Sequence, residues 1–493
     1  MLGTLSRLIP VGVFLFYLHY TSFDLGWSDS YGYVTVAHRL ARFEFAACET
    51  TLESLGIGGD GIVSTPLAYS FINGRSVPVY PFGAPAMMAP LVWILGPRGP
   101  FYLPPLMGAL CFVLLYRIGK EIAGRATGYA AAGLGLAWPP LFSFATIAMS
   151  DVVGAFFILL ATMSLLKSRG RPLFATGAGL AIGMAFLVRP NLSLFVVPAA
   201  LYLLCERRAR RILDVAFGFL PAFLLQLWVH TAYYRPASLE GSYGAQTSLF
   251  TIHEFWRVAG AQLHWLVQFG MLSLLPFIGW AMVTPRLSAS SKTLVSAWFL
   301  VLLTFYGFYP AWHVWLLSRF LLPAHLLLLV VAAVGLVDAA RHCRTALLVR
   351  GAVPAIVILS IVNNALFLHD HDAYRIRVAW RTIARTAKTV KKHTGERSLV
   401  FAYSFSGFLR YYEGVRTANL EAGPEACERT IAACSSKGVP VFALIEKGGR
   451  EREMFEGLAS SRGAVRIAEV FGWVLYELAP VEMKAGALAV TRS

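Results

Sequence analysis

The chain has 493 residues, of which 57% are hydrophobic and only 14% are charged. Soluble proteins carry about 25% charged residues, so this composition and a mean hydropathy of +0.60 exclude an ordinary soluble fold. The net charge of +16 would suggest nucleic acid in a soluble protein. Here the Lys and Arg residues lie in short loops between apolar runs, where they set membrane topology, so we expect no nucleic-acid partner.

Apolar runs recur along the first 370 residues, each near the length of about 20 residues that crosses a bilayer. We predict a polytopic α-helical membrane protein with about 11 transmembrane helices, near 5–24, 101–119, 126–145, 150–166, 173–188, 191–205, 212–232, 263–282, 293–310, 320–337 and 351–368. No A-x-A cleavage site follows the first run, which indicates a retained helix rather than a signal peptide. The apolar stretch 84–96 is short and favours an interfacial or re-entrant helix.

Charge predicts the orientation of these helices, because loops rich in Lys and Arg face the cytoplasm. Alternate loops carry most of these residues: Arg117, Lys120 and Arg125; Lys167, Arg169 and Arg171; Arg207, Arg208, Arg210 and Arg211; Arg286 and Lys292; Arg341, Arg344 and Arg350. The other loops, about 25–83, 233–262 and 311–319, are predicted outside. The N-terminus is then cytoplasmic, and everything after about residue 369 is extracytoplasmic.

From about residue 371 to 493 the composition changes, and we predict a small extracytoplasmic α/β domain after a membrane module of residues 1–370. Strands are expected at 398–404, 439–446 and 470–478, with helices at 407–414, 426–438 and 450–461. No GxGxxG or P-loop pattern marks a nucleotide site here. Two of its cysteines, Cys427 and Cys434, could pair in an oxidising compartment or remain free thiols.

The large first external loop, 25–83, contains two candidate segments. Asp29 starts an amphipathic helix in which Tyr33 follows at helical spacing. Asp29 is either a functional acid near the membrane surface or an N-cap aided by Ser28. Further along, three prolines and a glycine between residues 78 and 85 predict a stiff turn, with Tyr80 as a pocket residue.

Three ionisable residues lie at the ends of predicted membrane helices. Asp151 is in the first turn of the fourth helix, where the helix dipole alone could explain it, although it shares the predicted external level of Asp29. Arg189 has apolar runs on both sides and should face protein, water or an anion. Arg319 follows an aromatic belt that includes Trp312 and either binds a lipid phosphate or forms a structural salt bridge.

Five short patterns in this order resemble the GT-C superfamily of membrane glycosyltransferases, in particular its dolichyl-phosphate-mannose–protein mannosyltransferase-like, RgtA/B/C/D-like bacterial branch. The resemblance covers about residues 8–370. It consists of Asp29 with Tyr33 and Ala37; Y-P-x-G-x-P from Tyr80 to Pro85; Ser150–Asp151; Gly179, Gly183, Arg189 and Pro190; and R-F-L-L-P from Arg319 to Pro323. Many relatives have two adjacent acids in the first loop, whereas here the second position is Ser30.

The resemblance implies an inverting glycosyltransferase of the bacterial inner membrane. Its donor would be a polyprenyl-phosphate sugar, and its acceptor a lipid, glycan or protein hydroxyl at the outer face. Asp29 would be the catalytic base, with Asp151 orienting the helix of Asp29 or the acceptor. Arg319, with Arg189, would stabilise the departing phosphate. The pocket would be shaped by Tyr33, Tyr80, His313 and the aromatic residues of 305–315, which include Trp312. No cofactor is certain: a divalent cation is possible, but a single motif acid weakens that expectation.

A transporter or flippase for a lipid-linked sugar is the competing class, since many helices and an intramembrane arginine suit it too. Transporters often show internal repeats and paired broken helices, neither of which is visible here. A non-catalytic scaffold would leave the long first loop unexplained. The C-terminal domain either binds the acceptor or caps the cavity.

Overall fold

The computed structural model describes residues 2–44, 52–57, 61–72, 75–233, 250–309, 314–342, 346–448 and 450–479. The chain divides into two compact units. The helical unit contains the described parts of 1–23, 81–229 and 244–376, and the second unit contains mainly those of 24–80 and 377–493. The first loop and the C-terminal tail therefore belong to the same unit. We had expected a single domain boundary near residue 370.

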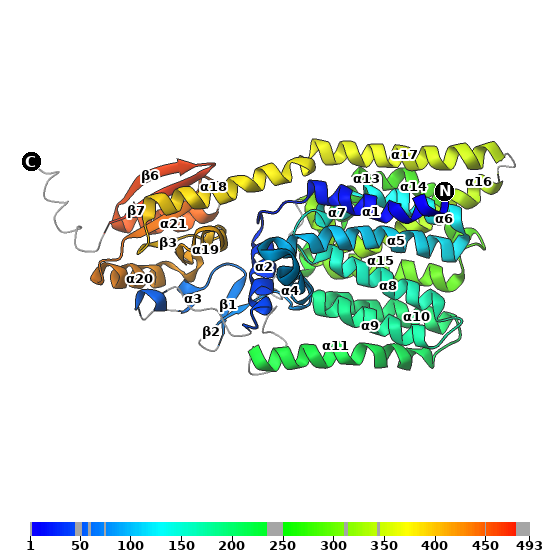
Figure 1. The fold of residues 1–493 in the computed structure, drawn as a ribbon, viewed down its shortest axis with the longest axis horizontal. Helices are drawn as coiled ribbons and strands as arrows, with labels where there is room; N and C mark the ends of the chain where they lie inside the picture. Colours follow the sequence, from blue (N-terminus) through cyan, green and yellow to red (C-terminus); the bar gives the residue numbers. More distant parts are fainter. Residues whose placement is uncertain are drawn as a thin grey trace, which may run out of the picture. The chain divides into compact units, whose positions relative to one another are not determined.

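The helical unit is built from apolar helices, most of which run side by side along one direction (Figure 1). They are α1 (Leu2–Tyr20), α4 (Gly83–Leu95), α5 (Leu103–Ala123), α6 (Arg125–Leu136), α7 (Pro139–Ala145), α8 (Asp151–Lys167), α9 (Leu173–Val188), α10 (Val196–Cys205), α11 (Arg211–Tyr233), α13 (Phe255–Gln268), α14 (Met271–Val283), α15 (Ala289–Gly307), α16 (Leu322–His342) and α17 (Ala346–Asp370). Short 3-10 helices lie at Gly96–Tyr102, Pro190–Phe195 and Trp315–Leu321.

Length and hydropathy identify a multi-pass membrane protein. Among the described residues, five helices are long and apolar enough to cross a membrane, or six if one bent pair counts as a span. Three shorter apolar helices lie at Leu8–Tyr20, Leu173–Val188 and Pro190–Cys205. The polytopic helical fold is confirmed, while the count of about 11 spans stays a prediction.

Two predicted helices are interrupted. The prediction of a single helix at 263–282 was wrong. The structure has two helices there, α13 and α14, which are bent by 96° relative to each other at the break. Gly270 there has φ of +81°, a left-handed conformation that glycine adopts without a steric penalty. The helix expected at 126–145 ends as α6 at Leu136 and resumes as α7, because Trp138 precedes a proline and a residue before proline is disfavoured in α conformation.

The second unit contains a five-stranded mixed sheet in the order β4-β3-β5-β7-β6. The strands are β3 (Leu399–Phe401), β4 (Arg416–Ala418), β5 (Val441–Glu446), β6 (Ala464–Val470) and β7 (Trp473–Leu478). β3 pairs in parallel with β4 and β5, whereas β7 is antiparallel to both β5 and β6. The strands expected around β3, β5 and β7 are confirmed, and β4 and β6 were not predicted.

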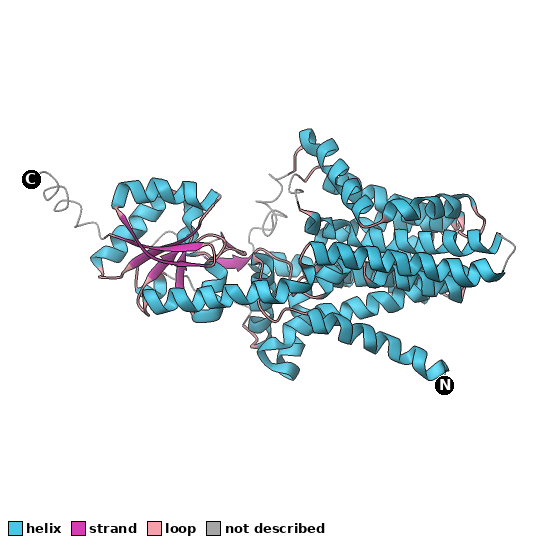
Figure 2. Ribbon diagram, turned by 90° about the horizontal axis from the view of Figure 1, so that it is seen from above, coloured by secondary structure: helices cyan, strands magenta, loops and turns pink. Residues whose placement is uncertain are grey.

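Helices cover both faces of this sheet (Figure 2). They are α18 (Ile376–Thr394), α19 (Ser406–Glu413), α20 (Pro424–Ser436) and α21 (Arg450–Arg462). Two of them, α19 and α20, connect β3 to its neighbour β4 and then β4 to β5 on the other side of β3. Cys427 and Cys434 on α20 are free and buried, and burial raises their pKa to about 12 and about 11.

The first loop is an integral part of this second unit. It forms α2 (Ser28–Ala41), α3 (Gly61–Ser64) and a hairpin of β1 (Tyr69–Ile72) and β2 (Arg75–Pro78). Its apolar residues Leu52, Ile57 and Val63 are buried in one core with strand and helix residues of the tail. The backbone amide of Asn419 donates to the carbonyl of Val63 at 2.7 Å. The amphipathic helix predicted from Asp29 onward is therefore present, and it belongs to a folded unit rather than to a bare loop.

Candidate functional site

Three of the residues singled out from sequence come together at one end of the helical unit. Asp151 is the first residue of α8, where a carboxylate is favoured by the helix dipole. Arg189 ends α9 in an extended conformation, φ −151° and ψ +105°, because the proline that follows disfavours a further helical residue. Arg319 lies in the 3-10 helix Trp315–Leu321, just before α16.

Asp151 holds both guanidinium groups through the same carboxylate oxygen. Arg189 Nη1 donates to Asp151 Oδ1, and Arg319 Nε lies 3.8 Å from that oxygen. The side chain of Asp151 is 1% exposed and that of Arg319 is 9% exposed, so these are interior charges. Two positively charged side chains therefore converge on one buried carboxylate.

Aromatic rings enclose the two guanidinium groups. The Arg189 and Arg319 guanidinium carbons each lie 4.8 Å from the centre of the Phe320 ring. Phe320 stacks on Tyr306 with centroids 4.7 Å apart and ring planes 14° apart. The Tyr306 hydroxyl accepts a hydrogen bond of 2.6 Å from the side-chain amide of Asn191. Cation–π contacts of this kind hold a guanidinium group in a fixed orientation in a poorly solvated site.

Sequence reasoning did not identify Phe320 or Asn191 as site residues. Phe320 lies inside the R-F-L-L-P pattern directly after Arg319, and Asn191 directly follows the Arg189–Pro190 pair. That adjacency is a signal that could have selected them. Tyr306 lies in the range 305–315, whose aromatic residues we expected to shape the pocket, but its hydrogen bond with Asn191 was not predicted.

Close helix packing explains why a glycine, Gly83, occupies this position of the Y-P-x-G-x-P pattern. A Cβ at Gly83 would overlap the backbone of Leu187 and Val188, so α4 begins in direct contact with the end of α9. Arg189 follows these two residues immediately. A glycine at this position therefore lets α4 approach the segment that presents Arg189.

The other candidate residues lie in the second unit, where Asp29 is held by a tyrosine. The Tyr80 hydroxyl donates a 2.7 Å hydrogen bond to Asp29 Oδ1, and the Ser28 hydroxyl donates to the same oxygen at 3.4 Å. The Tyr33 and Tyr80 rings pack with centroids 5.0 Å apart. Burial, followed by the charge of Asp29, raises the pKa of Tyr80 well above its ordinary value. Tyr80 therefore remains a hydrogen-bond donor to Asp29 over the physiological pH range.

The alternative that Asp29 is an N-cap is wrong. The helix α2 begins at Ser28, its N-cap position is Trp27 in an extended conformation, and no side chain caps the helix. Asp29 is instead within the first helical turn, half-buried, with its carboxylate directed to Tyr80. The structure thus assigns Asp29 a side-chain partner from a segment 51 residues away.

Two expectations have no structural counterpart. Trp312 and His313 lie outside the described residues, so they stay predicted pocket residues. Throughout the described ranges, no group of three or more His, Cys, Asp or Glu side chains is arranged to hold a metal ion.

Comparison with known proteins agrees with this architecture. Residues 100–234, which include Asp151 and Arg189, match the family model described as dolichyl-phosphate-mannose-protein mannosyltransferase. ArnT from Cupriavidus metallidurans bound to undecaprenyl phosphate has a similar structure, with a TM-score of 0.63 and 13% identity over 96% of this chain and 97% of that chain. The family model matches about a quarter of the chain, and the likeness to ArnT shows a shared GT-C fold.

Other structures share the GT-C fold at comparable identity. The Archaeoglobus fulgidus oligosaccharyltransferase in complex with Zn and sulfate has a TM-score of 0.54 and 13% identity, over 96% of this chain and 73% of that one. The mycobacterial arabinofuranosyltransferase AftD has a TM-score of 0.55 and 13% identity, over 96% of this chain and 40% of that one. No curated protein sequence matches the chain. At such low sequence identity, these structural similarities are evidence for a shared fold alone.

Proposed function

We propose that this chain is a GT-C glycosyltransferase that moves a sugar from a polyprenyl-phosphate-linked donor to an acceptor hydroxyl, with inversion at the anomeric carbon. The observation that carries the proposal is the buried pair of guanidinium groups, Arg189 and Arg319, around one carboxylate. Two fold relatives point to the same donor chemistry: the ArnT structure contains undecaprenyl phosphate, and an Archaeoglobus fulgidus AglB structure contains dolichol-phosphate.

The Asp151–Arg189–Arg319 cluster is suited to a phosphate. A lipid phosphate that approaches Arg319 brings negative charge to two neighbouring guanidinium groups, and guanidinium binds phosphate oxygens through two parallel hydrogen bonds. Asp151 keeps both arginines in position when no phosphate is bound. In the transition state the phosphate accumulates charge as it departs, so preorganised guanidinium groups stabilise it more than they stabilise the bound donor.

Asp29 is proposed as the base. The acceptor oxygen attacks the anomeric carbon from the face opposite the phosphate, and its proton passes to the Asp29 carboxylate. The bond between the anomeric carbon and the phosphate oxygen breaks, and its electron pair leaves with the polyprenyl phosphate. Because a phosphate leaves without protonation, one carboxylate is enough for this inverting reaction. The hydrogen bond from Tyr80 supports the role by fixing one oxygen of Asp29.

The remaining predicted residues complete the proposal. The packed rings of Tyr33 and Tyr80 are suited to one wall of the sugar site, with Trp312 and His313 contributing from the loop before Arg319. We place the reaction at the outer face of a bacterial inner membrane, with the N-terminus cytoplasmic and the tail outside, from the loop charges. Nucleotide sugars are absent from that side, so a lipid must carry the donor sugar across.

The direct test of the base is Asp29→Asn in reconstituted protein supplied with a labelled polyprenyl-phospho-sugar. We expect sugar transfer to fall by about 10²–10⁴-fold, the usual contribution of a positioned acid–base group. Asp24→Asn removes the same charge from the same loop and should retain activity. Wild-type turnover in Asp29→Asn, or an equal loss in both variants, would remove Asp29 from this role.

A second pair of variants tests the phosphate site. Arg319→Gln should lower turnover by about 10²–10³-fold, as expected for the loss of one preorganised charge donor. Arg257→Gln, an exposed arginine of α13 paired with Glu254, should have little effect. The anomeric configuration of the product, read from its proton NMR coupling constant, tests inversion. Movement of intact donor across the membrane without release of polyprenyl phosphate would contradict transfer altogether.

A further inference from the structure

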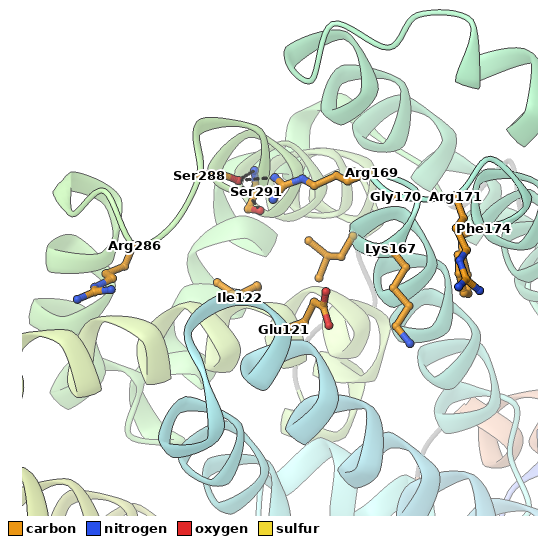
Figure 3. A pocket seen from close by; sticks show the side chains of 11 residues that line it. Glu121, Ile122, Lys167, Arg169, Gly170, Arg171, Phe174, Arg286, Ser288 and Ser291 are labelled. Carbon is orange, nitrogen blue, oxygen red and sulfur yellow. Dashed lines mark hydrogen bonds between the residues drawn. The ribbon is translucent and has the colours of Figure 1, made fainter.

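A second charged cavity lies at the other end of the helical unit from Asp151. It has a volume of about 330 Å³, within the range of ligand pockets, and is formed by α5, the α8–α9 loop and the segment before α15. Figure 3 shows the side chains around this hollow, with Lys167 and Glu121 on one side and Arg169, Ser288 and Ser291 on another. None of these residues takes part in the proposed sugar transfer.

Positive charge predominates among the lining residues, which include Lys167, Arg169, Arg171 and Arg286 against the single acid Glu121. Arg169 is already engaged, since its Nη2 donates to Glu206 at 2.7 Å and to Ser288 at 2.9 Å. Arg286 is likewise engaged, with its Nε 3.2 Å from an oxygen of Asp338.

The two other cations supply the charge that a ligand could use. Lys167 and Arg171 are both exposed, and in the described part of the chain neither forms an ion pair. Lys167 lies 5.5 Å from the centre of the Phe174 ring, a cation–π contact that leaves its ammonium group accessible. The cavity therefore offers two accessible positive charges beside two that are already neutralised.

The cavity also offers hydroxyl donors at the start of a long helix. α15 begins at Ala289, and the Ser288 side chain accepts a hydrogen bond from the backbone amide of Ser291. The Ser288 and Ser291 hydroxyls line the cavity. The positive end of the α15 dipole and these hydroxyls add to the cationic side chains, a combination that favours the oxygens of a phosphate.

Position and apolar neighbours favour a lipid as the source of that phosphate. Asp151 and Lys167 are the first and last residues of α8, which places them about 24 Å apart at 1.5 Å per residue. The cavity is therefore close to the opposite membrane surface, on the side that the arginine-rich loops assign to the cytoplasm. Ile122, Leu166 and Phe174 line it, and neighbouring Leu173 is 79% exposed, so acyl chains would find apolar contacts beside the charges.

We propose that this cavity binds the phosphate headgroup of an anionic phospholipid of the cytoplasmic leaflet. Lys167 and Arg171 pair with the phosphate, and the Ser288 and Ser291 hydroxyls hydrogen-bond to its oxygens. Basic pockets between membrane helices on the cytoplasmic side recognise anionic headgroups in this way. The bound lipid joins the ends of α5, α8 and α15 and stabilises the helical unit. The site is separate from the sugar-transfer site and holds even if the proposed reaction is wrong.

The test uses the full-length protein in detergent, with lipid binding counted by native mass spectrometry and stability followed by thermal melting. Phosphatidylglycerol should bind in a saturable way and raise the melting temperature, whereas phosphatidylcholine should not. The double variant Lys167→Gln/Arg171→Gln should bind phosphatidylglycerol about 25-fold more weakly, at roughly fivefold per lost charge. Arg207→Gln/Arg210→Gln, exposed cations in the next basic loop at this end, is the matched control and should bind normally.

Each alternative result has a clear consequence. Equal weakening in both double variants would mean that the basic loops attract lipid without a site, and would overturn the proposal. Unchanged binding in Lys167→Gln/Arg171→Gln would overturn it as well. If inorganic phosphate at equal concentration gave the same stabilisation as phosphatidylglycerol, the cavity would bind free phosphate, and the lipid assignment would be wrong.

Discussion

Asp151→Asn is the substitution whose effects the structure defines best. It removes a buried carboxylate that contacts the guanidinium groups of both Arg189 and Arg319. The two guanidinium groups would then lose the negative charge that they share. Breaking a buried ion pair by removing one partner costs about 3–5 kcal/mol. We expect Asp151→Asn to lower the stability of the protein by that amount.

A phosphate ligand should reverse this loss. In the wild type, a bound phosphate competes with Asp151 for the same two arginines, whereas in Asp151→Asn it replaces the missing negative charge. We expect polyprenyl phosphate to bind the variant about tenfold more tightly, equivalent to about 1.4 kcal/mol. At a fixed ligand concentration the rise in melting temperature should therefore be larger for Asp151→Asn than for the wild type.

Thermal melting in detergent, with and without polyprenyl phosphate, measures both effects. Glu451→Gln is the control, because Glu451 is also a buried carboxylate, hydrogen-bonded to the backbone amide of Ser404 in the C-terminal domain. That variant should also lose stability but gain nothing extra from the ligand. If Asp151→Asn melted like the wild type, or if both variants gained equally from polyprenyl phosphate, the account of the cluster as a phosphate site would be refuted.

Two further substitutions test local features. Because the pKa of Tyr80 is raised in the folded protein, the folded form holds this proton more tightly than the unfolded form, and stability is lost as pH rises above about 10. Tyr80→Phe should reduce that loss, and identical melting curves for both proteins between pH 9 and 11 would contradict the Tyr80–Asp29 contact. Gly335→Ala should destabilise by about 1–3 kcal/mol, since a Cβ would overlap the backbone of Phe277, whereas Gly279→Ala meets no atom and should melt like the wild type.

The membrane helices could be predicted from sequence because their signal is local. Runs of apolar residues and the basic loops between them located α8, α9, α15 and α16 closely, and the change in composition near residue 371 marked the tail domain. The bend between α13 and α14 was not predicted, because one glycine in an apolar run is common. Its left-handed conformation is visible only once the chain is folded.

The structure of the tail and of the first loop was harder to predict from sequence, because it depends on weak local patterns and on contacts between distant parts of the chain. β4 is three residues long, and β6 is largely exposed, so neither has the apolar alternation that distinguishes a half-buried strand. The packing of Val63 and its neighbours into the tail core depends on contacts across more than 350 residues, which no local pattern encodes.

The candidate site was predicted in part. Helix ends, prolines and isolated charges selected Asp151, Arg189 and Arg319 one at a time. Their convergence on a single carboxylate oxygen depends on how three separate elements pack, and the same holds for the partnership of Asp29 with Tyr80. The aromatic ring of Phe320 that holds both arginines is equally a product of packing.

The most direct test of the account is an experimental structure of the protein with polyprenyl phosphate bound. We predict that the phosphate oxygens lie within hydrogen-bonding distance of Arg319 and Arg189, and that the Asp29 carboxylate opens onto the same cavity. A phosphate bound away from both arginines, or an Asp29 side chain in a separate cavity, would contradict the proposed sugar transfer.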